Sequence, residues 1–188
     1  DKQLPVAAGL GGGSADAAAL IRLVDRAFAI NSDPERLIAA TASLGADVGA
    51  CIISQTRRGT GTGWQLTAVD DADVRGLPVL LVNPRLPLAT GPVFKGWDGV
   101  DRGPLAQGSA LAAARAGRND LEPPALRLCP DIDGVLAVLR AQLPLLARMS
   151  GSGASCFALF RSAPERDAAA QRIARDHPDW WLLSGAIR

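Results

Sequence analysis

The spacing of apolar residues predicts two consecutive helices near the start of the chain. Between residues 15 and 29, apolar side chains recur at intervals of three and four, with charged residues between them. The apolar positions are Leu20, Leu23, Val24, Ala27 and Phe28, and those expected to face outward are Arg22, Asp25 and Arg26. A second helix is expected from Pro34 to Leu44. Residues 31–33 supply its cap, proline suits its first position and Gly45 ends it.

The next apolar segments favour strands. Val48–Ile53 is a short, continuous apolar run that suits a buried strand. Gly59–Gly63, with glycine at every second position, could be a second phosphate cradle. Because it lies between a strand-like segment at 51–54 and an alternating segment at 64–69, a hairpin turn is the better interpretation. The polar stretch Asp70–Asp73 breaks the composition, and we place the boundary between domains 1–72 and 73–188 there.

The second half of the chain alternates between strand and helix patterns. Strands are expected at 77–82, at 156–160 and from Trp180 onward, and helices at 111–116, 119–129, after 131 and between 162 and 177. Asp131 and Asp133 could suggest a cation site, but helix capping explains them better, since an aspartate-rich loop pattern is lacking. These elements predict an α+β fold whose second domain is a ferredoxin-like α/β sandwich.

Composition narrows the function. The 188 residues include 20 basic and 19 acidic side chains, a net charge of +1, so the chain lacks the basic footprint of nucleic-acid-binding proteins. Cys51, Cys129 and Cys156 are far apart and indicate buried thiols in a reducing compartment. No apolar run approaches the roughly 20 residues needed to span a membrane. We therefore expect a cytoplasmic protein with no nucleic acid and no membrane as partner.

The strongest chemical signal is the glycine-rich stretch Gly9–Ser14, which runs directly into the first predicted helix. The missing Cβ atoms allow positive φ angles and a close backbone approach to a ligand, and the free N–H groups of a helix start suit a phosphate. Ser14 could cap the helix or add a hydroxyl ligand. The stretch fits neither the dinucleotide fingerprint nor the Walker pattern. A purely structural turn is the alternative, and the three glycines before a hydroxyl residue favour phosphate.

These residues also carry a resemblance to a known family. Residues 5–18, Pro-Val-Ala-Ala-Gly-Leu-Gly-Gly-Gly-Ser-Ala-Asp-Ala-Ala, resemble the ATP-binding motif of the GHMP kinases. Leu44–Val48 resembles their catalytic-aspartate segment, and Met149–Ala154 resembles their third motif. The resemblance implies ATP and Mg²⁺ as cofactors, and a partial ribosomal S5-like nucleotide-binding domain ahead of the ferredoxin-like domain. It assigns nucleotide binding to Pro5, Val6, Ala7, Ala8, Gly9, Leu10, Gly11, Gly12, Gly13, Ser14 and Ala15.

Two further residues gain roles from the resemblance. Asp47 alone would be a cap or turn former between a helix and a strand, but in the family this aspartate faces the substrate hydroxyl. Thr90 alone would be an ordinary loop hydroxyl before Gly91-Pro92, whereas the family has a threonine that contacts the substrate at this point. We therefore assign Asp47 to catalysis and Thr90 to substrate binding. The metal ligands and the oligomeric state stay unassigned.

The triple glycine is most similar to the GHMP kinases that phosphorylate the 2-hydroxyl of 4-diphosphocytidyl-2-C-methyl-D-erythritol in non-mevalonate isoprenoid synthesis. The expected substrate is thus a cytidine-diphosphate sugar alcohol. The alternatives are a GHMP kinase for another alcohol and a non-catalytic nucleotide- or RNA-binding S5-like module. In the family a substantial N-terminal portion precedes the glycine loop, which here comes within ten residues of Asp1. We therefore expect a fragment without a catalytic lysine, and doubtful activity for the fragment alone.

Overall fold

The structure, a computed structural model, describes residues 4–6 and 8–188 and divides into two compact units. Unit 2 is Gly11–Asp71, and unit 1 combines the residues up to Leu10 with Ala72–Ile187. The chain therefore passes from one unit to the other after Leu10 and again after Asp71. These units follow packing alone, and the division into domains 1–72 and 73–188 stays a prediction.

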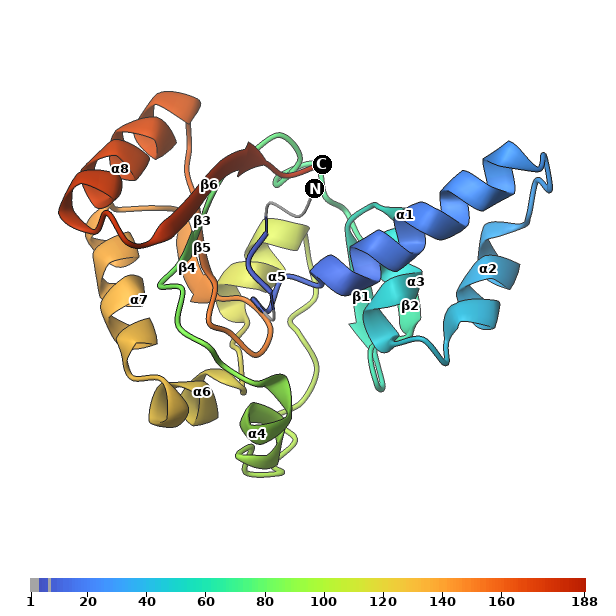
Figure 1. The fold of residues 1–188 in the computed structure, drawn as a ribbon, viewed down its shortest axis with the longest axis horizontal. Coiled ribbons are helices and arrows are strands. Elements are labelled where there is room, and N and C mark those ends of the chain that lie inside the picture. Colours follow the sequence, from blue (N-terminus) through green and yellow to red (C-terminus); the bar gives the residue numbers. More distant parts are fainter. Residues whose placement is uncertain (1–3, 7) are drawn as a thin grey trace. The chain divides into compact units, whose positions relative to one another are not determined.

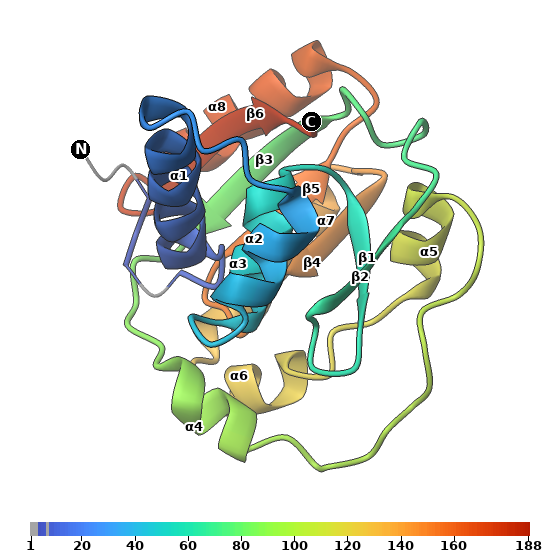
Figure 2. The same ribbon diagram turned by 90° about the vertical axis from the view of Figure 1, so that its right-hand side faces the viewer.

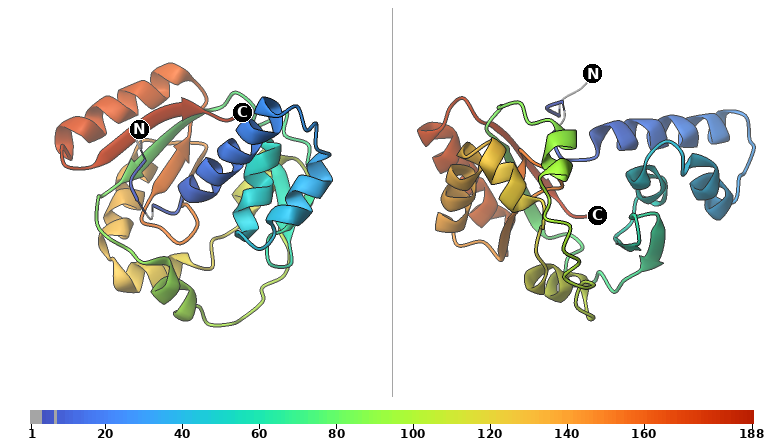
Figure 3. Two further views of the ribbon diagram at one scale, coloured as in Figure 1. Left: turned by 45° about the vertical axis from the view of Figure 1, so that its right-hand side comes forward. Right: turned by 90° about the horizontal axis from the view of Figure 1, so that it is seen from below.

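Unit 2 contains helices α1 (Gly12–Ala27), α2 (Pro34–Thr41) and α3 (Ala46–Ile53). Helices α1 and α3 lie side by side (Figure 3). Their contact buries Ala18, Val48 and Ile52, with Ala17, Ile21, Leu37 and Cys51 packed around them. The cap predicted for α2 is confirmed, because the Asp33 carboxylate accepts hydrogen bonds from the amides of Glu35 and Arg36.

The prediction of a strand at Val48–Ile53 was wrong, since these residues form most of α3. A short apolar run has no clear period, and the decisive contact comes from elsewhere in the chain. Val48 and Ile52 are four residues apart, so a helix turns both onto α1, where the small side chain of Ala18 allows a close approach. Gly49 packs closely as well, because a Cβ there would lie 3.1 Å from Ile38 Cγ2 and Ile38 would have to shift to admit it.

The helix at the start of the chain is confirmed as α1, but its predicted inner face is wrong. Leu20 and Leu23 are each 61% exposed, and Phe28 is 74% exposed. Arg22, expected to face outward, instead donates from Nη1 to the carbonyl oxygens of Cys51 at 2.5 Å and Ile52 at 3.4 Å. These carbonyls belong to the last turn of α3, where helix acceptors lack intrahelical partners, so a cation satisfies them.

The predicted hairpin is confirmed. Strands β1 (Arg57–Thr60) and β2 (Gln65–Ala68) pair antiparallel, with Arg57 opposite Ala68 and Thr60 opposite Gln65 (Figure 2). Gly61 (φ 62°) and Gly63 (φ 95°) supply the positive φ angles of the turn. The first strand starts at Arg57 rather than at Cys51, because residues 51–53 complete α3.

Unit 1 is built on a four-stranded antiparallel sheet in the order β4-β5-β3-β6. Its strands are β3 (Pro78–Asn83), β4 (Leu146–Met149), β5 (Cys156–Leu159) and β6 (Trp181–Ala186). Helices α7 (Asp131–Ala141) and α8 (Ala163–Asp176) cover one face, where the core lies (Figure 1). The succession β3-α7-β4-β5-α8-β6 is the β-α-β-β-α-β arrangement of ferredoxin-like domains, which confirms the predicted sandwich. The core includes Leu80, Val82, Val135, Leu136, Leu139 and Phe160.

Shorter helices connect β3 to α7: α4 (Thr90–Lys95), α5 (Ala110–Ala116) and α6 (Glu122–Leu128). Side chains hold α5 at both ends. The Asp73 carboxylate accepts from the Leu111 amide at 3.1 Å, and Arg148 donates to the carbonyls of Ala114 at 2.8 Å and Gly117 at 2.6 Å. Residues 96–109 form a long irregular connection before α5 (Figure 2).

The helix caps of unit 1 were only partly predictable. Ser162 Oγ accepts from the Glu165 amide at 3.3 Å, which confirms the cap of α8. Asp131 and Asp133 lie in the first turn of α7, where their charge is favourable, but among the described residues no side chain caps this helix. Their capping role is therefore corrected. No helix in the described ranges is long and apolar enough to cross a bilayer.

Candidate functional site

The glycine loop (Gly9–Ser14) ends in an open helix terminus. Gly11 is the N-cap of α1, with φ 63° and ψ 20°, and its carbonyl oxygen accepts from the Ala15 amide at 2.9 Å. The first turn reads Gly-Gly-Ser-Ala, so it contains no carboxylate. The amides of Gly12, Gly13 and Ser14 cannot find carbonyl acceptors inside the helix, which makes this end suitable for an anion. Ser14 lies inside the helix, so its predicted role as a cap is corrected.

Asp47 lies beside this terminus within unit 2. Its Oδ2 atom is 3.9 Å from the point that a Cβ on Gly11 would occupy. Asp47 is exposed in the first turn of α3, and the next residue, Val48, is 2% exposed and fixes the rotation of the helix. Gly45 occupies the N-cap of α3, and in the described part of the chain no side chain caps that helix. Asp47 is therefore not a helix cap, and its carboxylate is directed to the start of α1.

The pKa of the Cys51 thiol, one turn beyond Asp47, depends on burial and on the charges of two neighbouring side chains. Burial raises the pKa of Cys51, the Asp47 carboxylate raises it further, and the Arg22 guanidinium lowers it. A thiol with a raised pKa stays protonated and is a poor nucleophile at neutral pH. Cys51 is thus a packing residue of the α1–α3 contact.

In unit 1, Ala8 and Gly9 at the start of the glycine loop accept hydrogen bonds from a second loop, Ser150–Ser155, here called the serine-glycine loop. Ser150 Oγ donates to the Gly9 carbonyl at 2.7 Å, and the Ser155 amide donates to the Ala8 carbonyl at 3.3 Å. Gly9 has φ 68°, and a Cβ there would lie 2.4 Å from the Ser150 carbonyl oxygen. Among the other predicted nucleotide-binding residues, Pro5 is half-buried, Val6 is exposed, and Ala7 lies outside the described residues.

Thr90 contacts the same serine-glycine loop. It is the first residue of α4, and its Oγ1 accepts from the buried Ser152 Oγ at 3.2 Å. The exposed threonine hydroxyl thus has a fixed protein partner within unit 1. The other predicted side chain of the site, Asp47, belongs to unit 2, so the two residues lie in different units.

Sequence reasoning missed the polar residues that hold the serine-glycine loop. Asn83, 3% exposed at the end of β3, donates from Nδ2 to Ser155 Oγ at 2.9 Å. Asn119 donates to the carbonyls of Met149 and Gly151. An amide that ends an apolar strand was the available signal for Asn83. Asn119 resembled a helix start, and its contacts lie about thirty residues away in sequence.

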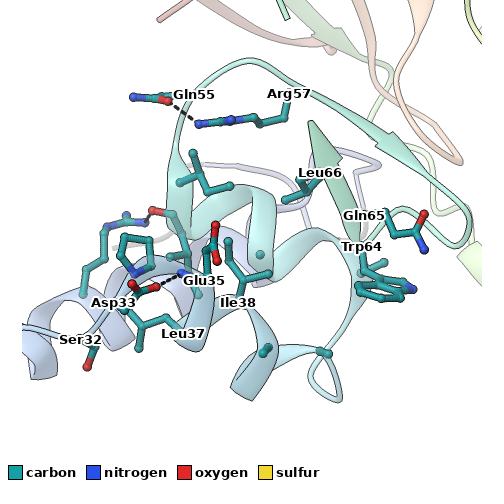
Figure 4. Close-up of a pocket in the computed structure, with 18 of the residues that line it drawn as sticks. Ser32, Asp33, Glu35, Leu37, Ile38, Gln55, Arg57, Trp64, Gln65 and Leu66 are labelled. Carbon is teal, nitrogen blue, oxygen red and sulfur yellow. Dashed lines mark hydrogen bonds between the residues drawn. The ribbon is translucent and has the colours of Figure 1, made fainter. Parts of the chain in front are cut away.

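Unit 2 also has a separate hollow of about 1070 Å³ between α2, α3 and the hairpin (Figure 4). Figure 4 shows Arg57 donating to Gln55 Oε1 at 2.9 Å on one side and the Asp33 cap of α2 on the other. The described residues that line the hollow include neither Asp47 nor any of Gly11–Ser14. Its apolar lining consists largely of Leu37, Ile38, Ile52, Ile53, Trp64 and Leu66.

Among the residues that the structure describes, no cluster of three or more histidine, cysteine, aspartate or glutamate side chains could hold a metal ion. The lack of such a cluster in the described residues is compatible with Mg²⁺ bound together with a nucleotide. Mg²⁺ commonly takes one carboxylate and uses phosphate oxygens and water for its remaining positions.

Comparison with known proteins defines the class. Residues 1–55 match the GHMP kinase N-terminal domain family, and residues 104–179 match the GHMP kinase C-terminal family. A homoserine kinase from Cytophaga hutchinsonii shares the fold, with a TM-score of 0.72 over 99% of this chain and 68% of that chain at 16% identity. The chain belongs to the GHMP kinase family.

Within this family, several similar proteins carry one name. A 4-diphosphocytidyl-2-C-methyl-D-erythritol kinase from Rhizorhabdus wittichii is 58% identical over the whole chain, which spans 64% of that relative. The Erythrobacter litoralis protein of the same name is 50% identical, and the chain spans 69% of it. A crystal structure of 4-(cytidine 5'-diphospho)-2C-methyl-D-erythritol kinase superposes with a TM-score of 0.79 at 30% identity, covering 98% of this chain and 68% of that one.

Proposed function

We propose that this chain provides the nucleotide-binding loop and an acid–base residue of a kinase that transfers the γ-phosphoryl group of ATP to the 2-hydroxyl of 4-diphosphocytidyl-2-C-methyl-D-erythritol. One observation carries the proposal. The N-terminus of α1, where Gly11 is the N-cap residue and no described side chain caps the helix, has the Asp47 carboxylate beside it. Phosphoryl transfer needs positioning and charge stabilisation more than covalent chemistry by the protein. A set of free amides next to a single carboxylate suits those two tasks.

In this mechanism residues 5–15 hold ATP. The amides of Gly12–Ser14 donate to phosphate oxygens, and the positive end of α1 stabilises the negative charge that develops during transfer. Asp47 orients the acceptor hydroxyl and takes its proton as the oxygen attacks phosphorus. Thr90, held by Ser152, contacts the substrate. Mg²⁺ held together with the nucleotide at this end of α1 would neutralise part of the phosphate charge.

The domain assignment belongs to the same proposal. Residues 1–72 are part of an ATP-binding N-terminal domain, and residues 73–188 form the C-terminal domain of the GHMP architecture. The matches of residues 1–55 and 104–179 to the two GHMP domain families support this division. Because the chain spans 64–69% of these relatives, activity is assigned to a protein of their full length.

The test uses a chimera in which this chain is joined to the part of the Rhizorhabdus wittichii relative outside the matched region. We expect the chimera to release ADP with 4-diphosphocytidyl-2-C-methyl-D-erythritol and to ignore homoserine, mevalonate and galactose. A coupled ADP assay measures each rate. Preference for one of the three other alcohols would assign the chain to a different GHMP kinase activity. Absence of nucleotide binding by calorimetry would remove the kinase proposal altogether.

A further inference from the structure

One side chain of unit 1 bonds the carbonyl oxygens of Met149 and Gly151, the residues on either side of Ser150 in the serine-glycine loop. Asn119, in the connection between α5 and α6, donates from Nδ2 to the Met149 carbonyl at 3.1 Å and to the Gly151 carbonyl at 2.8 Å. A side-chain amide has two N–H donors, so these bonds use its full donor capacity. The backbone on both sides of Ser150 is therefore fixed by a single residue.

The remaining contact of Asn119 fixes the amide itself. Its Oδ1 accepts from the Leu121 amide at 3.0 Å, which is the local turn that asparagine and aspartate both form. This contact orients the side chain so that the N–H groups point to the serine-glycine loop. The side chain is half-buried, so water competes less with its bonds than at an open surface.

The atoms that Asn119 places in position act on the predicted site residues. Ser150, between the two bonded carbonyls, donates its 2.7 Å bond to Gly9, two residues before the N-cap of α1. Two positions after Ser150, Ser152 donates to Thr90. A shift of this loop would thus displace both the approach to the glycine loop and the partner of Thr90.

We propose that Asn119 is a positioning residue for nucleotide binding, which acts by setting the serine-glycine loop and through it the backbone at Ala8 and Gly9. The part of the proposal that concerns the nucleotide rests on the proposed function. The part that concerns the loop stands on the hydrogen bonds within unit 1.

Asn119→Asp separates positioning from local structure. Aspartate keeps the acceptor for the Leu121 amide, but it loses both donors and brings a carboxylate against two carbonyl oxygens. We expect the backbone amides of Gly153, which donates to the Ser150 carbonyl, and Ser155, which donates to Ala8, to exchange hydrogen about tenfold faster. In the chimera, ATP affinity by calorimetry should fall by a similar factor. If thermal melts show that Asn119→Asp is unfolded, Asn119→Ala replaces it with the same expectations.

The matched control is Ser162→Ala. Ser162 caps α8 in the same unit and touches no residue of either loop in its described contacts, so its loss lowers stability without moving the serine-glycine loop. Exchange at Gly153 and Ser155 that is unchanged in the Asn119 variant, or accelerated equally by Ser162→Ala, overturns the proposal. So does faster exchange with unaltered ATP affinity. If the parent chimera binds no ATP, the proposed function fails, and amide exchange alone then decides whether Asn119 positions the loop.

Discussion

Ser150 Oγ donates a 2.7 Å hydrogen bond to the carbonyl oxygen of Gly9, which lies 141 residues earlier in the chain. The backbones themselves meet here, because a Cβ on Gly9 would fall 2.4 Å from the Ser150 carbonyl oxygen and 2.6 Å from that of Gly153. The positive φ of Gly9 also disfavours any other residue. The start of the glycine loop therefore depends on glycine for packing as well as for conformation.

Replacement of this residue by alanine gives a direct stability prediction. Gly9→Ala should lower the free energy of unfolding of unit 1 by about 2 kcal/mol or more, from overpacking against backbone together with left-handed strain. Urea denaturation of the 188-residue chain measures it. Gly134→Ala is the control, because Gly134 lies inside α7 with nothing within 4 Å of an added Cβ, and alanine there should stabilise by about 0.5–1 kcal/mol. Equal effects of the two substitutions would contradict the packing argument.

Asp47 should separate catalysis from binding. In the chimera, Asp47→Asn should lower turnover by about 100- to 10,000-fold, the range for loss of a general base, and leave ATP affinity near that of the parent. Steady-state kinetics and calorimetry measure the two quantities. Asp131→Asn is the control, since Asp131 also lies in the first turn of a helix and is exposed. Near-parental turnover for Asp47→Asn would refute the catalytic role.

Because Arg22 points inward, its replacement should lower stability more than replacement of the exposed Arg26. Arg22→Met should destabilise unit 2 by about 1.5–3 kcal/mol, because the carbonyls of Cys51 and Ile52 lose a charged donor. Arg26→Met, one turn further along α1 at an exposed position, should change stability by less than about 0.5 kcal/mol. Urea midpoints of the two variants provide the comparison. If both lose the same stability, Arg22 does not support the last turn of α3.

Cys156 predicts a loss of stability at alkaline pH. Burial raises its pKa to about 12 from the ordinary value of 9.0, so the folded state keeps the proton that the unfolded state releases. The stabilising contribution is complete below pH 9 and falls as the pH rises from 9 towards 12, by about 1.4 kcal/mol at pH 10. The chain contains no tyrosine to obscure this titration.

Urea unfolding at pH 8 and pH 10 tests this dependence. Cys156→Ala should reduce the loss between the two pH values by about 1.4 kcal/mol, although it also lowers stability at both. The same pH-dependent loss of stability is measured for Cys129→Ala as a comparison, because burial raises the pKa of the Cys129 thiol as well. A loss that is the same with and without Cys156 would show that this thiol ionises as readily in the folded protein as in the unfolded chain.

Local signals allowed much of the fold to be predicted. Asp33 before Pro34, Ser162 before Glu165, and the glycines at 61 and 63 each act through bonds or dihedral angles of their immediate neighbours, so sequence alone identifies them. The ferredoxin-like sandwich followed from the succession of strand and helix patterns in the second half of the chain, although β4 was not among the predicted strands.

Errors arose where a distant partner decides the structure. Val48–Ile53 became a helix because it packs against Ala18, and Leu20 is exposed because Arg22 lies on the inner side of α1. The candidate site shows the same division. The glycine loop, Asp47 and Thr90 came from motifs, and their roles stay predictions. Asn83 and Asn119 act on carbonyls and hydroxyls that are about thirty residues or more away, and no short pattern indicates such contacts.

The double passage of the chain between the units has a consequence for folding during synthesis. Residues Gly11–Asp71 of unit 2 form one continuous stretch, so the contacts within it do not depend on the later strands of unit 1. Ala8 and Gly9 must wait for Ser150 and Ser155, and contacts of such long sequence separation form slowly because the closing segment is long. The approach to the glycine loop is therefore among the last parts of unit 1 to order. The contacts that fix the start of the glycine loop can form only when the unit 1 sheet is nearly complete.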